Sequence, residues 1–132
     1  MIAKKWQTPQ LISVALLVLT AVIVITPLCG LLFQCHCDWP WSGLYQRCNI
    51  FQASAIHQCP WCKSTLAGLV STGTAFFSAV WVTRSIQPAP VTNRLKNIAA
   101  RYCSACAVFI WVAVLCGIVA ARLQHYPVDL FG

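Results

Sequence analysis

The residues of this chain that could do chemistry gather in one stretch, Cys35–Lys63, which reads CHCDWPWSGLYQRCNIFQASAIHQCPWCK. It contains five of the nine cysteines and two of the three histidines in the 132 residues. Thiolate and imidazole bind soft metal ions, and thiolates also form and exchange disulfides. The stretch therefore admits three kinds of chemistry: structural disulfides, metal binding and thiol–disulfide exchange.

Structural disulfides are the first interpretation, because a loop with few aliphatic side chains cannot build much core. One cysteine of the Cys35–Cys37 pair would bond to one of the Cys59–Cys62 pair, and Cys48 to another cysteine. The five cysteines of the loop are an odd number, and the sequence leaves the connectivity open. The disulfide candidates are Cys29, Cys35, Cys37, Cys48, Cys59, Cys62 and Cys116.

Metal binding is the second interpretation, since soft ligands stand close together in Cys35-His36-Cys37 and again in His57-x-Cys59-x-x-Cys62. Thiolates suit Cu(I) and zinc, and imidazole suits zinc and copper. The Cys-x-Cys spacing departs from the usual zinc knuckle, so we place copper ahead of zinc. The metal-ligand candidates are Cys35, His36, Cys37, His57, Cys59 and Cys62.

Thiol–disulfide exchange is the third interpretation, and its catalytic candidates are Cys59 and Cys62. Their C-x-x-C motif precedes an apolar run, so we expect it at a helix start, where a thiolate is favoured. Lys63 adds a positive charge beside it. With one or two further loop cysteines, the motif loosely resembles the membrane disulfide-generating enzymes that use quinone, including the vitamin K epoxide reductase-like group. That resemblance implies a four-helix core; because this chain has three spans, we do not expect quinone.

Other reaction classes are excluded by composition. The chain has two acidic residues and no glutamate, which removes paired-carboxylate catalysis, and it has no Gly-rich phosphate loop. Only 8% of the residues are charged and 59% are hydrophobic, against about 25% charged in a soluble domain. So few charges cannot cover a water-facing surface. The sequence therefore predicts an integral membrane protein in contact with the lipid bilayer.

Three apolar stretches are long enough to cross a bilayer, at residues 11–33, 64–83 and 102–121. We predict an all-α membrane protein with three transmembrane helices in a single domain, residues 1–132. Residues 34–63 form its Cys-rich extracytoplasmic loop and residues 84–101 a basic connector. Small and hydroxyl residues recur in the second span, which favours close helix packing. We therefore expect the second helix to be the central one.

The basic residues predict the orientation. Six of them fall on the side of the N-terminus and the connector, against three on the other side, and the basic-rich side is normally cytoplasmic. We predict a multi-pass protein of the inner (plasma) membrane with its N-terminus in the cytoplasm and its C-terminus outside. The net charge of +7 does not indicate nucleic acid, because the basic residues form no stripe with interleaved aromatics.

Two consequences follow for the cysteines and tryptophans near the loop. Counting helical rise, Cys29 and Cys116 should lie at the base of the loop, about one or two turns inside the outer ends of their helices. Trp61 should join an interfacial aromatic belt. Cys103 and Cys106, a second C-x-x-C at the cytoplasmic edge, we interpret as small apolar residues within a helix.

The function that we favour from sequence is non-enzymatic. A small chain with a disulfide-stapled outer loop suits a subunit or accessory protein that contacts other membrane subunits or further copies of itself. Copper or zinc trafficking through the loop is the first alternative. Exchange through Cys59 and Cys62 is the second, and it would make the protein a thiol–disulfide oxidoreductase.

Overall fold

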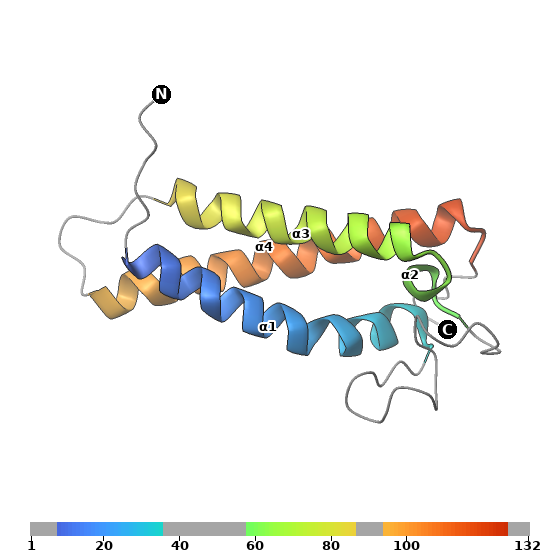
Figure 1. Cartoon of the computed structure of the whole chain (residues 1–132), viewed down its shortest axis with the longest axis horizontal. Helices are drawn as coiled ribbons and strands as arrows, with labels where there is room; N and C mark the ends of the chain where they lie inside the picture. The colour runs from blue at the N-terminus through green and yellow to red at the C-terminus, as the bar shows by residue number, and fades with distance from the viewer. Residues whose placement is uncertain (1–7, 36–57, 87–93, 127–132) are drawn as a thin grey trace.

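The computed structural model describes residues 8–35, 58–86 and 94–126, and these are almost entirely helical. Helix α1 covers Thr8–Phe33, the short helix α2 Pro60–Lys63, helix α3 Thr65–Ser85 and helix α4 Arg94–Leu123. The three long helices run side by side, each antiparallel to the one before it in the chain, with α2 at one end of the bundle (Figure 1). No strand occurs among the residues described. The all-α class is confirmed.

Each long helix can cross a membrane by its length and composition, over residues Gln10–Phe33, Thr65–Ser85 and Leu95–Leu123. At a rise of about 1.5 Å per residue the three helices are roughly 39, 32 and 45 Å long, against about 30 Å for a hydrocarbon core. Large apolar side chains point outward along all three, among them Leu19, Phe77 and Trp111. This arrangement suits a protein whose surface faces lipid. The orientation in the membrane stays a prediction.

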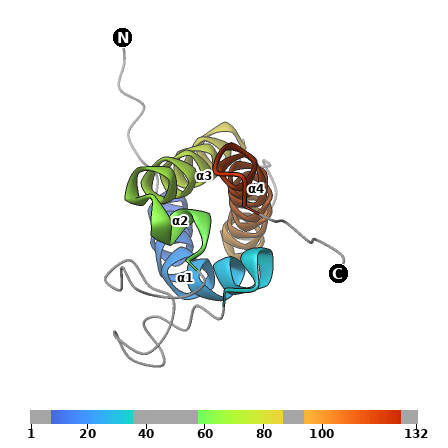
Figure 2. The same cartoon turned by 90° about the vertical axis from the view of Figure 1, so that its right-hand side faces the viewer.

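Helix α4 begins at Arg94, inside the stretch predicted as a connector, and continues without interruption to Leu123. It packs along both α1 and α3, whereas α1 and α3 touch each other much less. The expectation that the second span would be central is therefore wrong, because α4 is the helix that packs on both others. Figure 2 shows the three long helices end on, with α2 near the middle of the view.

Small side chains make this packing close, as the sequence predicted for the second span. The buried residues of α3 recur every fourth position, which places them in one row along the helix. Helix α4 carries a matching row with the same spacing. In lipid the hydrophobic effect does not drive helices together, so their association depends on close contact, which small residues allow. The α3 row is Ser71, Ala75, Ala79 and Thr83; the α4 row is Arg101, Ala105, Phe109, Ala113, Gly117 and Ala121.

Arg101 is the one member of these rows that carries a charge, and it is 1% exposed. Its Nη1 donates to the backbone carbonyl of Thr83, in the last turn of α3, and its Nε donates to Oδ1 of Asn97 at 2.9 Å. The last four carbonyls of a helix have no partner within the helix, and a cation there complements the helix dipole. Arg101 therefore joins α4 to the C-terminal end of α3.

Polar contacts also join α1 to α4. The Ser13 hydroxyl donates to the carbonyl of Ile98 at 3.4 Å, and the hydroxyls of Thr20 and Tyr102 are 2.7 Å apart. Both pairs lie toward the end of the bundle that holds Arg101. The opposite end, where α1 and α4 finish and α2 and α3 begin, we call the thiol end.

Replacing Arg101 by alanine should destabilise the bundle by about 1–3 kcal/mol, because the Thr83 carbonyl would lose its donor inside the packed interface. The measurement is thermal unfolding of the purified protein in detergent, followed by circular dichroism. Lys96→Ala is the matched control, since Lys96 is an exposed basic residue on the same helix. Equal unfolding temperatures for the two variants would contradict the assigned role.

Candidate functional site: a buried thiol triad

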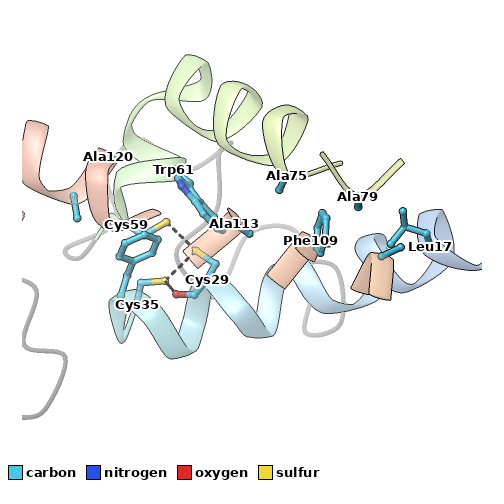
Figure 3. Close-up of a cluster of buried hydrophobic side chains, with 13 residues drawn as sticks. Leu17, Cys29, Cys35, Cys59, Trp61, Ala75, Ala79, Phe109, Ala113 and Ala120 are labelled. Atoms are coloured by element: carbon cyan, nitrogen blue, oxygen red, sulfur yellow. Dashed lines mark hydrogen bonds between the residues drawn. The ribbon is translucent and has the colours of Figure 1, made fainter. Parts of the chain in front are cut away.

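Three buried cysteine sulfurs converge at the thiol end (Figure 3). The Sγ of Cys29 is 3.1 Å from that of Cys59 and 3.7 Å from that of Cys35, and all three lie within 4.8 Å of one another. Their exposed fractions are 4%, 4% and 0% for Cys29, Cys35 and Cys59. We call this group the thiol triad.

The end of α1 positions two of the three sulfurs. Cys29 stands in the last turns of the helix, which ends at Phe33. Gln34 then takes a left-handed backbone conformation, with φ of 49°. This conformation commonly terminates helices because it turns the chain off the helix axis. The turn places Cys35 beside Cys29, close enough for its Sγ to lie 3.7 Å from the Cys29 carbonyl oxygen.

The third sulfur belongs to the N-cap of α2. Cys59 has extended backbone angles, and Pro60 follows at the first helical position, where its missing N–H costs nothing. The Cys59 sulfur accepts a hydrogen bond from the backbone N–H of Cys62 at 3.3 Å. An N-cap side chain normally accepts such a bond through oxygen. Here the bond fixes the position of the sulfur.

Aromatic side chains cover the triad. Trp61 is 6% exposed and meets the ring of Phe33 edge to face, with centroids 5.4 Å apart. Phe33 meets Tyr126 in the same manner at 5.9 Å. The prediction that Trp61 belongs to an interfacial belt is wrong, because α2 folds its side chain inward between α1 and α4.

Two glycines make room for Trp61. A Cβ added to Gly68 on α3 would lie 3.0 Å from the Trp61 carbonyl oxygen. A Cβ added to Gly117 on α4 would lie 3.2 Å from Cζ2 of Trp61 and 3.3 Å from Cζ of Phe33. Trp61 thus lies close to both glycines, and a Cβ at either position would require its neighbours to move by a few tenths of an ångström.

The end of α4 ties both thiol-bearing segments together. The Gln124 side-chain amide donates to the Pro60 carbonyl at 3.0 Å, and the Tyr126 hydroxyl donates to the Phe33 carbonyl at 3.0 Å. Tyr126 is itself held by its N–H, which donates to Ala121 at 2.9 Å in a Schellman turn with His125 in the left-handed position. Nothing in the sequence patterns indicated this role for Gln124 or Tyr126.

Among the residues that the structure describes, two buried polar atoms at this end have no hydrogen-bond partner. They are Oγ1 of Thr26, one helical turn before Cys29, and Nε1 of Trp61. A buried polar group without a partner costs about 1–3 kcal/mol. Within the described part of the thiol end, these two polar atoms therefore lower the stability of the packing around the triad.

The structure brings together some of the predicted site residues and separates others. Cys35 and Cys59, predicted as metal ligands and as disulfide candidates, are joined by Cys29, which was predicted as a disulfide candidate at the base of the loop but not as a metal ligand. Cys62 is partly exposed and packs against the same buried cluster. The predicted site residues His36, Cys37, Cys48 and His57 lie outside the described residues.

Cys116 does not join the triad. It lines an apolar groove of about 300 Å³ between α3 and α4, together with Ser71 and Ala120, and none of the residues that line this groove belongs to α1. Its place at the base of the loop stays a prediction, because residues 36–57 lie outside the described residues. At the other end of α4, Cys106 packs against the core and Cys103 is exposed.

The predicted disulfides are not found among the residues that the structure describes. The Cys29 and Cys59 sulfurs are 3.1 Å apart, against about 2.05 Å in a disulfide. No pair within 8–35, 58–86 and 94–126 lies at bonding distance. The observed geometry is that of three neighbouring thiols.

Comparison with known proteins finds no matching family model, no matching curated protein and no matching solved structure. The chemistry of the thiol end therefore has to be inferred from its own geometry.

Replacing Gly117 by valine should force Trp61 and Phe33 apart and loosen the cover of the triad. Overpacking of this kind costs about 1–3 kcal/mol, so alkylation of the triad cysteines by a maleimide should be faster by about tenfold. Gly73→Val is the matched control, since it makes the same change on α3 at a position with nothing within 4 Å. Equal alkylation rates in the two variants would contradict the role given to Gly117.

Proposed function

We propose that this protein binds one soft metal ion, Cu(I), through the thiolates of Cys29, Cys35 and Cys59. The observation that carries the proposal is the convergence of three buried sulfurs from two chain segments thirty residues apart, with every pair of sulfurs within 4.8 Å. Three thiols grouped only by hydrophobic burial have no reason to direct their sulfurs at a common point.

The spacing of the sulfurs supports a shared ion. A metal–sulfur bond of about 2.3 Å places sulfurs on one ion roughly 3.8–4.0 Å apart in tetrahedral or trigonal geometry. The separation of 3.7 Å between Cys29 and Cys35 is close to this value, and the 3.1 Å between Cys29 and Cys59 is shorter. The third separation, between Cys35 and Cys59, is at most 4.8 Å, so side-chain movements alone would bring the triad to that geometry.

The ligand set favours Cu(I) over zinc. Soft thiolates select Cu(I), which is stable with three sulfur ligands, whereas zinc sites are almost always four-coordinate. The fourth zinc position would need another protein ligand or water. The described part of the chain supplies three sulfurs at one point, and their exposed fractions are 0–4%.

Charge also matters, since each ligand must lose a proton before it binds. Cu(I) with two thiolates carries one net negative charge, and a third thiolate adds another. The Cys62 N–H that donates to the Cys59 sulfur stabilises part of this charge. Lys63, exposed on the same short helix, contributes a cation at the rim of the site. Binding should therefore release protons and weaken in acid.

The test is titration of the full-length protein with Cu(I), in detergent, without oxygen and with a reductant. A colorimetric Cu(I) chelator serves as the competitor. We expect one Cu(I) per chain, and a loss of affinity of about tenfold or more in each of Cys29→Ser, Cys35→Ser and Cys59→Ser, because replacing a metal ligand removes a bond of the inner shell.

Cys116→Ser is the matched control, because it removes a partly buried thiol that lies outside the triad. It should bind one Cu(I) with the affinity of the unmodified protein. Binding of no ion, or an equal loss in Cys116→Ser, would sink the proposal. Stoichiometric zinc held more tightly than Cu(I) under competition would reassign the metal.

A second candidate function is thiol–disulfide exchange, which the 3.1 Å between Cys29 and Cys59 favours. Two thiols at this distance need to approach by about 1 Å to bond. Forming the bond would release two protons and pass two electrons to the disulfide of an oxidant protein, which would become a dithiol. This differs from the predicted Cys59–Cys62 pair, because Cys29 provides the partner sulfur.

The redox state of the triad cysteines in the membrane distinguishes the two candidate functions. If Cys29 and Cys59 are exchange partners, rapid alkylation of unreduced membranes followed by mass spectrometry should recover them as one disulfide-linked peptide pair. If the protein holds Cu(I), alkylation after removal of copper by a chelator should recover all three triad cysteines as thiols. A Cys59–Cys62 disulfide would contradict both assignments.

An accessory role in a membrane assembly, which the sequence favoured, is a further proposal that is compatible with either chemistry. Its predicted contact surface, the loop of residues 34–63, lies mostly outside the described residues.

A further inference from the structure

We infer that Cys62 is the exchange ligand through which Cu(I) enters the triad from an external thiolate donor. This inference rests on the proposed function and extends it to the route of the ion. It assigns Cys62 a transient bond to the metal and leaves the resident ligands as Cys29, Cys35 and Cys59.

Because the three sulfurs of the triad are covered, Cu(I) needs a residue that an external donor can reach. Its sulfurs are 0–4% exposed, and Trp61 and Phe33 cover them, themselves 6% and 5% exposed. A donor outside the protein therefore cannot contact the three sulfurs while they remain covered. Because Cu(I) in water is held by ligands at all times, it must enter by exchange from one sulfur to the next.

Cys62 is placed to take part in both exchanges. It is partly exposed, yet it packs against the buried cluster that contains Cys29, Cys35 and Cys59. It follows Cys59 by three residues, and its N–H donates to the Cys59 sulfur at 3.3 Å, so the two residues share one turn of chain. Among the described cysteines of the thiol end, Cys116 lacks this position, since it faces α3.

The exchange is balanced without an oxidant. In the first step a Cu–S bond forms to Cys62, a Cu–S bond to the donor breaks, and the proton of the Cys62 thiol passes to the departing donor thiolate. In the second step the ion bonds to Cys59, whose proton returns to Cys62 as the Cu–S bond to Cys62 breaks. Cys29 then displaces the second donor thiolate, which leaves as a thiol with the Cys29 proton, and Cys35 bonds to the ion as its own proton passes to solvent. Copper stays Cu(I) throughout, and Cys62 ends as a thiol.

The chemistry of the rim indicates the class of donor. Lys63 is exposed next to Cys62, and no acidic residue lies within the described part of the thiol end. Cu(I) bound by two thiolates is anionic, so a positive rim attracts it. The geometry therefore points to an anionic Cu(I)–thiolate complex, carried by a small thiol or by a protein with cysteine ligands.

The experiment compares loading rate with equilibrium binding. Full-length protein in detergent is mixed without oxygen with Cu(I)–glutathione, and the Cu–thiolate absorption of the protein is followed by stopped flow after the baseline of the donor is subtracted. We expect Cys62→Ser to bind one Cu(I) at equilibrium but to load more slowly by about tenfold or more. Cys116→Ser should load at the unmodified rate.

A second measurement uses the unmodified protein, in case Cys62→Ser fails to fold. In the loaded protein, a maleimide should modify Cys62 while Cys29, Cys35 and Cys59 stay protected; after the chelator removes copper, all four should react. Loading of Cys62→Ser at the unmodified rate would overturn the inference. So would protection of Cys62 by bound copper, or loss of binding in Cys62→Ser, because Cys62 would then be a resident ligand. Failure of the unmodified protein to bind Cu(I) would instead overturn the proposed function.

Discussion

The contact on which the rest of the structure depends is the close packing of α4 against both α1 and α3. In lipid the hydrophobic effect does not drive helices together, so association relies on van der Waals contact and on hydrogen bonds between helices. Rows of mostly small residues on α3 and α4 provide the van der Waals contact. The hydrogen bonds of Ser13, Thr20 and Arg101 join the helices through polar groups. Because α1 and α3 touch little, their relative position is set by α4.

The geometry of the thiol end depends on that packing. Cys29 and Cys35 belong to the end of α1, and Cys59 to the segment before α3. The end of α4 bonds to both, through Tyr126 to the carbonyl of Phe33 and through Gln124 to that of Pro60. Trp61 fills the space between them against Gly117. The sulfurs therefore meet because a third helix holds the two segments that carry them.

The sequence predicted the three helices well, since runs of uncharged apolar residues are a strong local signal. It also placed Cys29 near the end of its helix, because helical rise is regular. It failed on the central helix and on Trp61. Both depend on which helix faces pair, and a helix that is apolar on every side does not show which face it buries. For the same reason the sequence did not indicate that Cys116 would line a groove between α3 and α4. The C-x-x-C motif drew attention to Cys59 with Cys62, while the observed partner, Cys29, stands thirty residues earlier.

The left-handed backbone of Gln34 allows two sulfurs of the triad, those of Cys29 and Cys35, to come from one short stretch of sequence. Along an uninterrupted helix, residues six apart point in directions about 120° from each other and lie about 9 Å apart along the axis, so Cys29 and Cys35 could not share an ion. The left-handed backbone of Gln34 changes that relation. Two of the three sulfurs are thus carried by seven consecutive residues, Cys29–Cys35, at the end of α1. Only the third sulfur, that of Cys59, comes from a distant part of the sequence.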